Sequence, residues 1–78
     1  MKLALLASGT GSTAEILFKY AAVLVTNNPG APVIEKAKNA GIPVEYVEKG
    51  DLGLEEYGQK LIEVLGKYEF DFISQNGW

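Results

Sequence analysis

The chain has 78 residues, of which 47% are hydrophobic and 22% charged, a balance typical of a small globular domain rather than of a disordered chain. Its formal net charge is −3 and its seven basic residues are all lysines, so it lacks the basic stripe and the guanidinium groups that nucleic-acid binding uses. It contains no cysteine and no histidine, which excludes a disulfide framework, a thiol nucleophile, an imidazole base and a zinc site built on these residues.

The length and the amino terminus limit the organisation of the chain. Residues 1–78 are long enough for one small domain or for part of a larger one. The apolar run near the amino terminus is interrupted at Ser8 and Gly9, before it reaches the length of a signal peptide or a membrane span. We therefore expect a cytoplasmic location and no membrane partner.

The first part of the chain predicts two buried strands with a helix between them. Lys2–Ala7 is a nearly continuous apolar run, which is typical of a strand covered on both faces of a parallel sheet. A helix is predicted over Thr13–Tyr20 and a second strand over Ala22–Thr26, followed by the turn-forming residues Asn27–Gly30. Hardly any loop separates this helix from the second strand, and the helix is short for a crossover between parallel strands.

The middle of the chain predicts a second helix and a third strand. Pro32 suits the first turn of this helix, which ends at Gly41. Its apolar positions keep helical spacing: Val33, Ala37 and Ala40. The strand Ile42–Val47 contains a proline and an alternating glutamate, which favour a position at the edge of the sheet.

The last part predicts a third helix over Leu54–Tyr68 and a fourth strand over Phe70–Ser74. The inner face of this helix consists of Leu54, Tyr57, Leu61, Val64, Leu65 and Tyr68. The alternation predicts an α/β fold, a Rossmann-like doubly wound parallel sheet with strand order 3-2-1-4 and three helices. Ligands of such sheets bind beyond the carboxyl ends of the strands, where the strand order reverses. Residues Gly9–Thr13 and Asn76–Trp78 are expected to lie there.

The segment after the first strand has the layout of a phosphate-binding loop. Gly9 and Gly11 allow positive backbone torsions and a close approach of a ligand, and the helix that follows presents unpaired N–H groups. An alternative interpretation is an ordinary turn in which Ser12 and Glu15 form a capping box for the helix. The candidate binding residues are Gly9, Thr10, Gly11, Ser12 and Thr13.

Four segments, taken in order, resemble the amino-terminal half of the phosphoribosylglycinamide formyltransferase family. They read ALLASGTGST (4–13), LVTNNPGAPVIEKAKNAGIPV (24–44), EEYGQKLIEVL (55–65) and DFISQNGW (71–78). The resemblance implies an enzyme of purine biosynthesis that transfers a formyl group from 10-formyltetrahydrofolate, its co-substrate, to glycinamide ribonucleotide. It implies no metal.

The same resemblance assigns roles to particular residues. It places the phosphate of the ribonucleotide on Gly11, Ser12 and Thr13, and it places Gly77 beside the same substrate. Trp78 is a candidate wall of the folate pocket.

Two residues depart from the family pattern. Thr13 stands where relatives usually carry asparagine, and Leu54 stands where some relatives place an arginine near the folate tail. The family's catalytic asparagine, histidine and aspartate come from later segments. None of the 78 residues is therefore assigned a catalytic role, and we expect the 78-residue chain alone to be inactive.

Two other functions fit parts of the sequence. Gly9, Gly11 and Ala14 match the alanine-ended form of the NAD-binding fingerprint, but Thr26–Asn28 supplies neither the acidic residue of an NAD site nor the arginine of an NADP site. The third possibility is a non-enzymatic interaction domain that pairs through its last strand. Phe70–Ser74 is an unprotected edge on which the chain is expected to self-associate.

Overall fold

The computed structural model describes residues 1–9, 12–48 and 53–76, in which strands and helices alternate. The strands are β1 (Leu3–Ala7), β2 (Ala21–Thr26), β3 (Val44–Tyr46) and β4 (Phe72–Asn76). The helices are α1 (Ser12–Ile16), α2 (Pro32–Asn39) and α3 (Leu54–Leu65), with a 3₁₀ turn, η1, at Phe18–Tyr20. None of the helices within these ranges is both long and apolar enough to cross a membrane.

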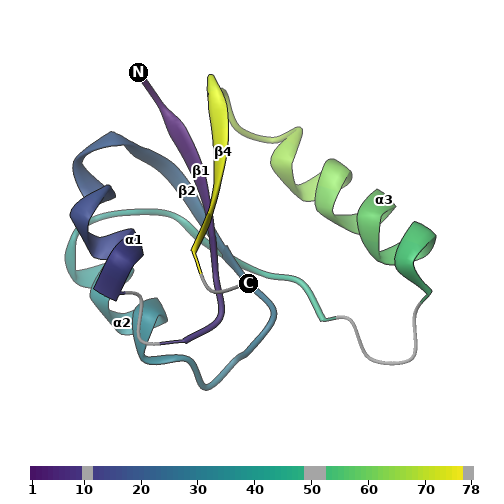
Figure 1. Cartoon of the computed structure of the whole chain (residues 1–78), viewed down its shortest axis with the longest axis horizontal. Helices are drawn as coiled ribbons and strands as arrows, with labels where there is room; N and C mark the ends of the chain where they lie inside the picture. Colours follow the sequence, from purple (N-terminus) through teal and green to yellow (C-terminus); the bar gives the residue numbers. More distant parts are fainter. Residues whose placement is uncertain (10–11, 49–52, 77–78) are drawn as a thin grey trace.

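The four strands form one parallel sheet in the order β3-β2-β1-β4 (Figure 1). Leu5 of β1 pairs with Leu24 of β2 on one side and with Ser74 of β4 on the other. The strand order reverses between β1 and β4, because the chain leaves β1 toward β2 and returns to the opposite side of β1. The predicted fold class, strand order and number of helices are confirmed.

The residues of β1 divide between two layers of the core, because successive side chains of a strand point to opposite faces. Leu3, Leu5 and Ala7 pack with residues of α1 and α2, whereas Ala4 and Leu6 pack with residues of α3. Figure 1 accordingly shows α1 and α2 on one side of the strands and α3 on the other. All five residues of β1 are buried, as predicted for a strand covered on both faces.

The predicted helix Thr13–Tyr20 is divided in the structure into α1 and η1. The Leu17 amide donates to the Ala14 carbonyl (2.8 Å), and the Tyr20 amide donates to the Leu17 carbonyl (2.9 Å). Both hydrogen bonds span three residues, and this tighter winding rises further per residue than an α-helix does. The short connection therefore reaches β2, which begins at Ala21, one residue earlier than predicted.

The second helix begins at Pro32 and ends before Gly41, as predicted. The predicted apolar position Ala40 is the exception. Pro32 occupies the first turn of the helix, and Gly41 follows the helix with a φ of 76°, in the left-handed region. The Ile42 amide donates to the Ala37 carbonyl (2.9 Å) and the Gly41 amide to that of Lys38 (3.0 Å), which together form a Schellman motif. Ala40 is the exposed C-cap residue and does not belong to the buried face.

The last two strands are displaced from their predicted ranges. β3 lies at the edge of the sheet as predicted, but it covers three residues of the predicted Ile42–Val47, since Ile42 belongs to the Schellman motif. β4 begins at Phe72 rather than at Phe70. The Asp71 amide donates to the Lys2 carbonyl (2.8 Å) and the Lys2 amide to the Asp71 carboxylate (2.9 Å), which fixes where pairing with β1 begins.

The third helix begins at Leu54 as predicted but ends at Leu65 rather than at Tyr68. Beyond Gly66 the amides of Lys67 and Tyr68 donate to carbonyls three residues back, so the helical winding tightens and stops. Four predicted inner-face residues pack in the core layer beneath the helix: Tyr57, Leu61, Val64 and Leu65. Tyr68 and Phe70 pack against the same layer from the segment between the helix and β4.

Candidate functional site

The carboxyl ends of β1 and β4 lie side by side, where the sequence predicts a ligand site. Ala7, the last residue of β1, pairs with Asn76, the last residue of β4. Ser8 and Gly9 continue from β1, and Ser12 begins α1 and is exposed. The remaining candidate residues Thr10, Gly11, Gly77 and Trp78, and the side chain of Thr13, lie outside the part of the chain that the structure describes.

One detail at Gly9 differs from the predicted phosphate loop and one agrees with it. Gly9 does not adopt a positive φ, since Gly41 is the glycine that does so among the described residues. A β-carbon at Gly9 would meet no atom within 4 Å, so the glycine leaves open space on this surface.

In the capping box, the alternative interpretation of this turn, Ser12 would precede the helix, whereas in the structure Ser12 is the first residue of α1. The carboxylate of Glu15 instead lies 3.9 Å from the Lys36 ammonium of α2. Both side chains are substantially exposed, so this ion pair contributes little stability.

The beginning of the candidate loop is joined to the connection between β2 and α2. The side-chain amide of Asn28 donates to the Ser8 carbonyl (3.3 Å), and the backbone amide of Val33 donates to the Gly9 carbonyl (3.2 Å). Val33 lies in the first turn of α2, whose amides have no partner within the helix. The Gly9 carbonyl therefore satisfies one end of α2 while α2 holds the start of the loop.

Asn28 is held by its own neighbours. The backbone amide of Asn28 donates to the Thr26 hydroxyl (3.2 Å), and that hydroxyl donates to the Asn28 carbonyl (3.4 Å). The Asn28 side-chain oxygen accepts the Gly30 amide (3.1 Å). Thr26 is fully buried at the end of β2. Sequence reasoning missed Thr26 and Asn28 as site residues, although the turn-forming sequence after β2 marks their position.

The groups that the described residues offer at this end of the sheet are mainly hydrogen-bonding groups. The described residues contribute backbone groups and serine hydroxyls, which suit an anion. Glu15, the acidic residue of α1, is engaged by Lys36. No cluster of carboxylates able to hold a metal ion occurs in the described ranges.

Two of the four tyrosines, Tyr57 and Tyr68, pack in or against the core layer beneath α3. Tyr57 is buried under α3, and burial raises the pKa of its phenol, while a hydrogen bond with the Asn27 side chain acts in the opposite direction. The Tyr68 hydroxyl donates to the Glu45 carboxylate (2.5 Å), and this hydrogen bond raises the pKa of Tyr68. Tyr46 is exposed on β3.

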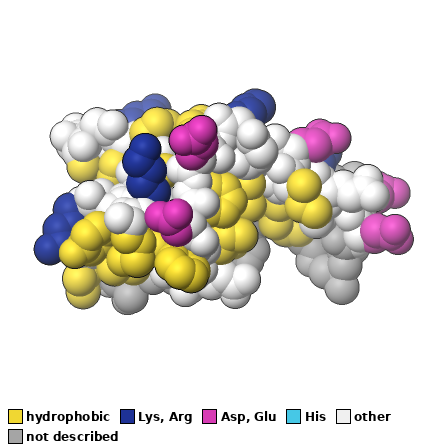
Figure 2. All heavy atoms as spheres, turned by 90° about the horizontal axis from the view of Figure 1, so that it is seen from above, with side chains coloured by type: hydrophobic (Ala, Val, Ile, Leu, Met, Phe, Trp, Pro, Cys, Tyr) yellow, Lys and Arg dark blue, Asp and Glu magenta, His cyan; other side chains and the backbone are white. Residues whose placement is uncertain are grey.

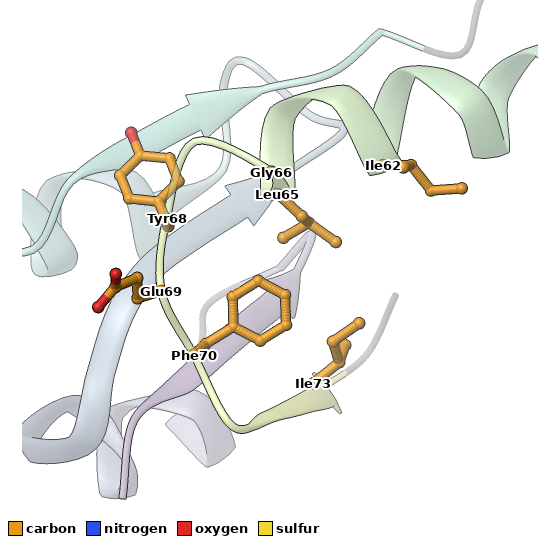
Figure 3. A pocket seen from close by; sticks show the side chains of 7 residues that line it. All are labelled: Ile62, Leu65, Gly66, Tyr68, Glu69, Phe70 and Ile73. Atoms are coloured by element: carbon orange, nitrogen blue, oxygen red, sulfur yellow. The ribbon is translucent and has the colours of Figure 1, made fainter.

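A separate apolar groove lies beside β4, toward its amino-terminal end. It encloses about 480 Å³ and is lined by Ile62, Leu65, Gly66, Tyr68, Glu69, Phe70 and Ile73. In Figure 3 the side chains of Leu65, Phe70 and Ile73 converge beneath α3. Figure 2 views the molecule from the amino-terminal ends of the strands. It shows hydrophobic side chains at the surface between the sheet and α3.

Comparison with solved structures connects this arrangement to known proteins. The chain superposes on phosphoribosylglycinamide formyltransferase from Streptococcus pneumoniae with a TM-score of 0.88 and 26% identity, covering 99% of this chain and 44% of that one. The enzyme from Bacillus halodurans gives a TM-score of 0.88 and 28% identity, with 100% and 45% of the two chains covered. The chain has the fold of the N-terminal part of a phosphoribosylglycinamide formyltransferase.

The formyltransferase from Brucella melitensis matches in fold with a TM-score of 0.91 at 21% identity, and 99% of this chain covers 45% of that one. The chain thus spans less than half the length of the formyltransferases that it matches. No protein-family model matches the sequence. The resemblance to phosphoribosylglycinamide formyltransferases predicted from the four sequence segments is confirmed for the fold.

Proposed function

We propose that the chain binds the phosphate group of glycinamide ribonucleotide, as a single nucleotide-binding domain that forms the N-terminal part of a formyltransferase. The observation that carries this proposal is the strand-loop-helix end of β1 beside the end of β4, in a fold shared with phosphoribosylglycinamide formyltransferases. The candidate contacts are those predicted from the sequence: Gly9, Thr10, Gly11, Ser12, Thr13 and Gly77.

In this proposal the complete enzyme transfers a formyl group from 10-formyltetrahydrofolate to the amine of glycinamide ribonucleotide during purine biosynthesis. The chain contributes substrate binding and one wall of the folate pocket at Trp78. Formyl transfer also requires stabilisation of an oxyanion and movement of a proton from the attacking amine. The sequence contains no histidine, and we propose that the residues which perform these steps lie outside residues 1–78, so that this chain alone is inactive.

The competing proposal of an NAD-binding module makes a different demand on the end of β2. An NAD site places an acidic side chain there to bind the ribose hydroxyls. Thr26 ends β2 and is followed by Asn27 and Asn28, so no carboxylate lies there, and the Asn28 side chain donates to the Ser8 carbonyl. This arrangement favours a mononucleotide ligand.

Calorimetry with glycinamide ribonucleotide, NAD and NADP distinguishes the two proposals. We expect the chain to bind the ribonucleotide more tightly than either dinucleotide. The two kinds of site share the phosphate loop, but the end of β2 lacks the carboxylate that would bind the ribose hydroxyls of NAD. Tighter binding of NAD than of glycinamide ribonucleotide would contradict the proposed function.

A second proposal concerns a partner rather than a substrate: we propose that β4 pairs with β4 of a second copy of the chain. β4 pairs with β1 along one side, and no other described strand pairs with it. The strand Phe72–Asn76 contains no charged residue and no proline, the features that protect natural edge strands. Antiparallel pairing of two copies therefore places no like charges opposite each other.

A further inference from the structure

We propose that Thr26 and Asn28 form a bracket that orients the first peptide groups of the candidate phosphate loop, which makes Asn28 a positioning residue for the phosphate. This inference rests on the proposed function of the loop. It concerns residues that the resemblance to formyltransferases did not single out. It is carried by the hydrogen bonds that join the end of β2 to the end of β1.

The first step of the argument concerns the orientation of the peptide group between Ser8 and Gly9. A peptide group is planar and trans, so its carbonyl and its N–H point in opposite directions. The Asn28 side-chain amide draws the Ser8 carbonyl toward the β2–α2 connection (3.3 Å). The Gly9 N–H of the same peptide group is consequently directed away from that connection.

The second step concerns the next peptide group, whose carbonyl belongs to Gly9. That carbonyl accepts the Val33 amide (3.2 Å), which again comes from the β2–α2 connection and its helix. Two successive carbonyls at the start of the loop therefore point to the same side. The N–H of Gly9, which faces away from that connection, is a backbone group that can donate to an anion.

The third step is the rigidity of the bracket itself. Thr26 is fully buried, and its hydroxyl both accepts from the Asn28 amide and donates to the Asn28 carbonyl. The Gly30 amide holds the Asn28 side-chain oxygen at 3.1 Å, which leaves the side-chain nitrogen facing Ser8. A loop ordered before the ligand arrives loses less conformational entropy on binding, and affinity rises accordingly.

The substitution Asn28→Ser tests the bracket. A serine at this position retains an oxygen for the turn to Gly30 but is too short to reach the Ser8 carbonyl. Asn39→Ser is the matched control, because Asn39 is exposed at the far end of α2. Two quantities are measured for each variant: the hydrogen-exchange rate of the backbone amides at positions 8–13, and the Kd for ribose 5-phosphate.

We expect Asn28→Ser to speed exchange at positions 8–13 and to weaken ribose 5-phosphate binding roughly three- to tenfold, the effect of losing one neutral hydrogen bond. The core amides of β1 and β2 should exchange as in the unsubstituted chain. Exchange and Kd equal to those of Asn39→Ser would overturn the inference, as would faster exchange with an unchanged Kd.

The two proposals fail in different ways. If the unsubstituted chain does not bind ribose 5-phosphate, the proposed function is wrong, and the exchange rates still decide whether the bracket orders the loop.

If Asn28→Ser does not fold, the pair Thr26→Val and Thr26→Ser replaces it. Valine preserves the shape of threonine without its hydroxyl, whereas serine retains the hydroxyl. Faster exchange and weaker binding in Thr26→Val, with both restored in Thr26→Ser, support the bracket, and identical behaviour of the pair overturns it.

Discussion

At the scale of single residues, the hydrogen bond from Tyr68 to Glu45 joins the segment after α3 to the edge strand β3. It connects residues 23 positions apart in the sequence (2.5 Å). We expect Tyr68→Phe to lower the free energy of unfolding by about 1 kcal/mol at pH 7, because a half-buried hydrogen bond contributes on that scale. Tyr20→Phe, a change at a more exposed tyrosine, should stay within about 0.5 kcal/mol of the unsubstituted chain.

This contribution should depend on pH. The hydrogen bond with Glu45 raises the pKa of Tyr68 in the folded chain above the ordinary value of 10.0. The stability is then fully present below the pKa of the unfolded chain and is lost as pH rises through the raised pKa of the folded chain. Urea unfolding of the unsubstituted chain and of Tyr68→Phe, at neutral pH and above pH 10, tests this dependence. The difference between their free energies of unfolding should be smaller in the alkaline range. An equal difference at both pH values would contradict this account.

The site also shows what residue patterns predict and what they leave out. The candidate loop could be located from Gly9 and the preceding apolar run, since strand, glycine and helix start are neighbours in sequence. The hydrogen bond from Asn28 to Ser8 spans 20 residues and depends on how β1 and β2 are aligned in the sheet. No local pattern contains that alignment, so the bracket became visible only in the structure.

At the scale of elements, the end of α2 depends on the left-handed backbone of Gly41. Its φ is 76°, and a β-carbon there would meet no atom within 4 Å, so a side chain at this position costs only backbone strain. We expect Gly41→Ala to destabilise the chain by about 1–2 kcal/mol. Gly58 lies inside α3, also with open space around a β-carbon, and Gly58→Ala should stabilise the chain by about 0.5–1 kcal/mol.

Urea unfolding midpoints of the two glycine variants measure both effects. The same substitution should shift the midpoint in opposite directions at the two positions. No shift, or a shift to higher urea, in Gly41→Ala would contradict the role assigned to the Schellman motif, and a shift to lower urea in Gly58→Ala would contradict the stabilisation expected in α3.

The order of the elements could be predicted because each apolar run and each helical spacing is local. The boundaries that differ have both long-range and local causes. The mutual hydrogen bonds of Lys2 and Asp71 set the start of β4, and the three-residue hydrogen bonds after Ala14 replace the second half of the first predicted helix.

At the scale of the whole molecule, β4 leaves apolar side chains exposed on both faces of the sheet. Phe72 aligns with Leu3 on the face of α1 and α2 and is 62% exposed, while Ile73 aligns with Ala4 on the α3 face and is 50% exposed. The apolar groove beneath α3 continues from Ile73. We expect the isolated chain to self-associate through this edge.

Sedimentation equilibrium of the chain and of two variants tests the association. Ile73→Lys should shift the chain toward monomer, because a charge on an edge strand opposes pairing with a second copy. Ile16→Lys places the same charge on α1, where the isoleucine is 74% exposed, and should leave the association unchanged. A monomeric unsubstituted chain, or equal effects of the two lysines, would contradict pairing through β4.

The central claim is that the loop from Gly9 to Thr13 binds the phosphate of a ribonucleotide. A titration of the isotopically labelled chain with glycinamide ribonucleotide, followed by amide chemical shifts residue by residue, tests it most directly. We predict saturable shifts that are largest at positions 9–13, with smaller ones at positions 76 and 77. Shifts confined to α3 and the apolar groove, or no shifts at millimolar ligand, would contradict the claim.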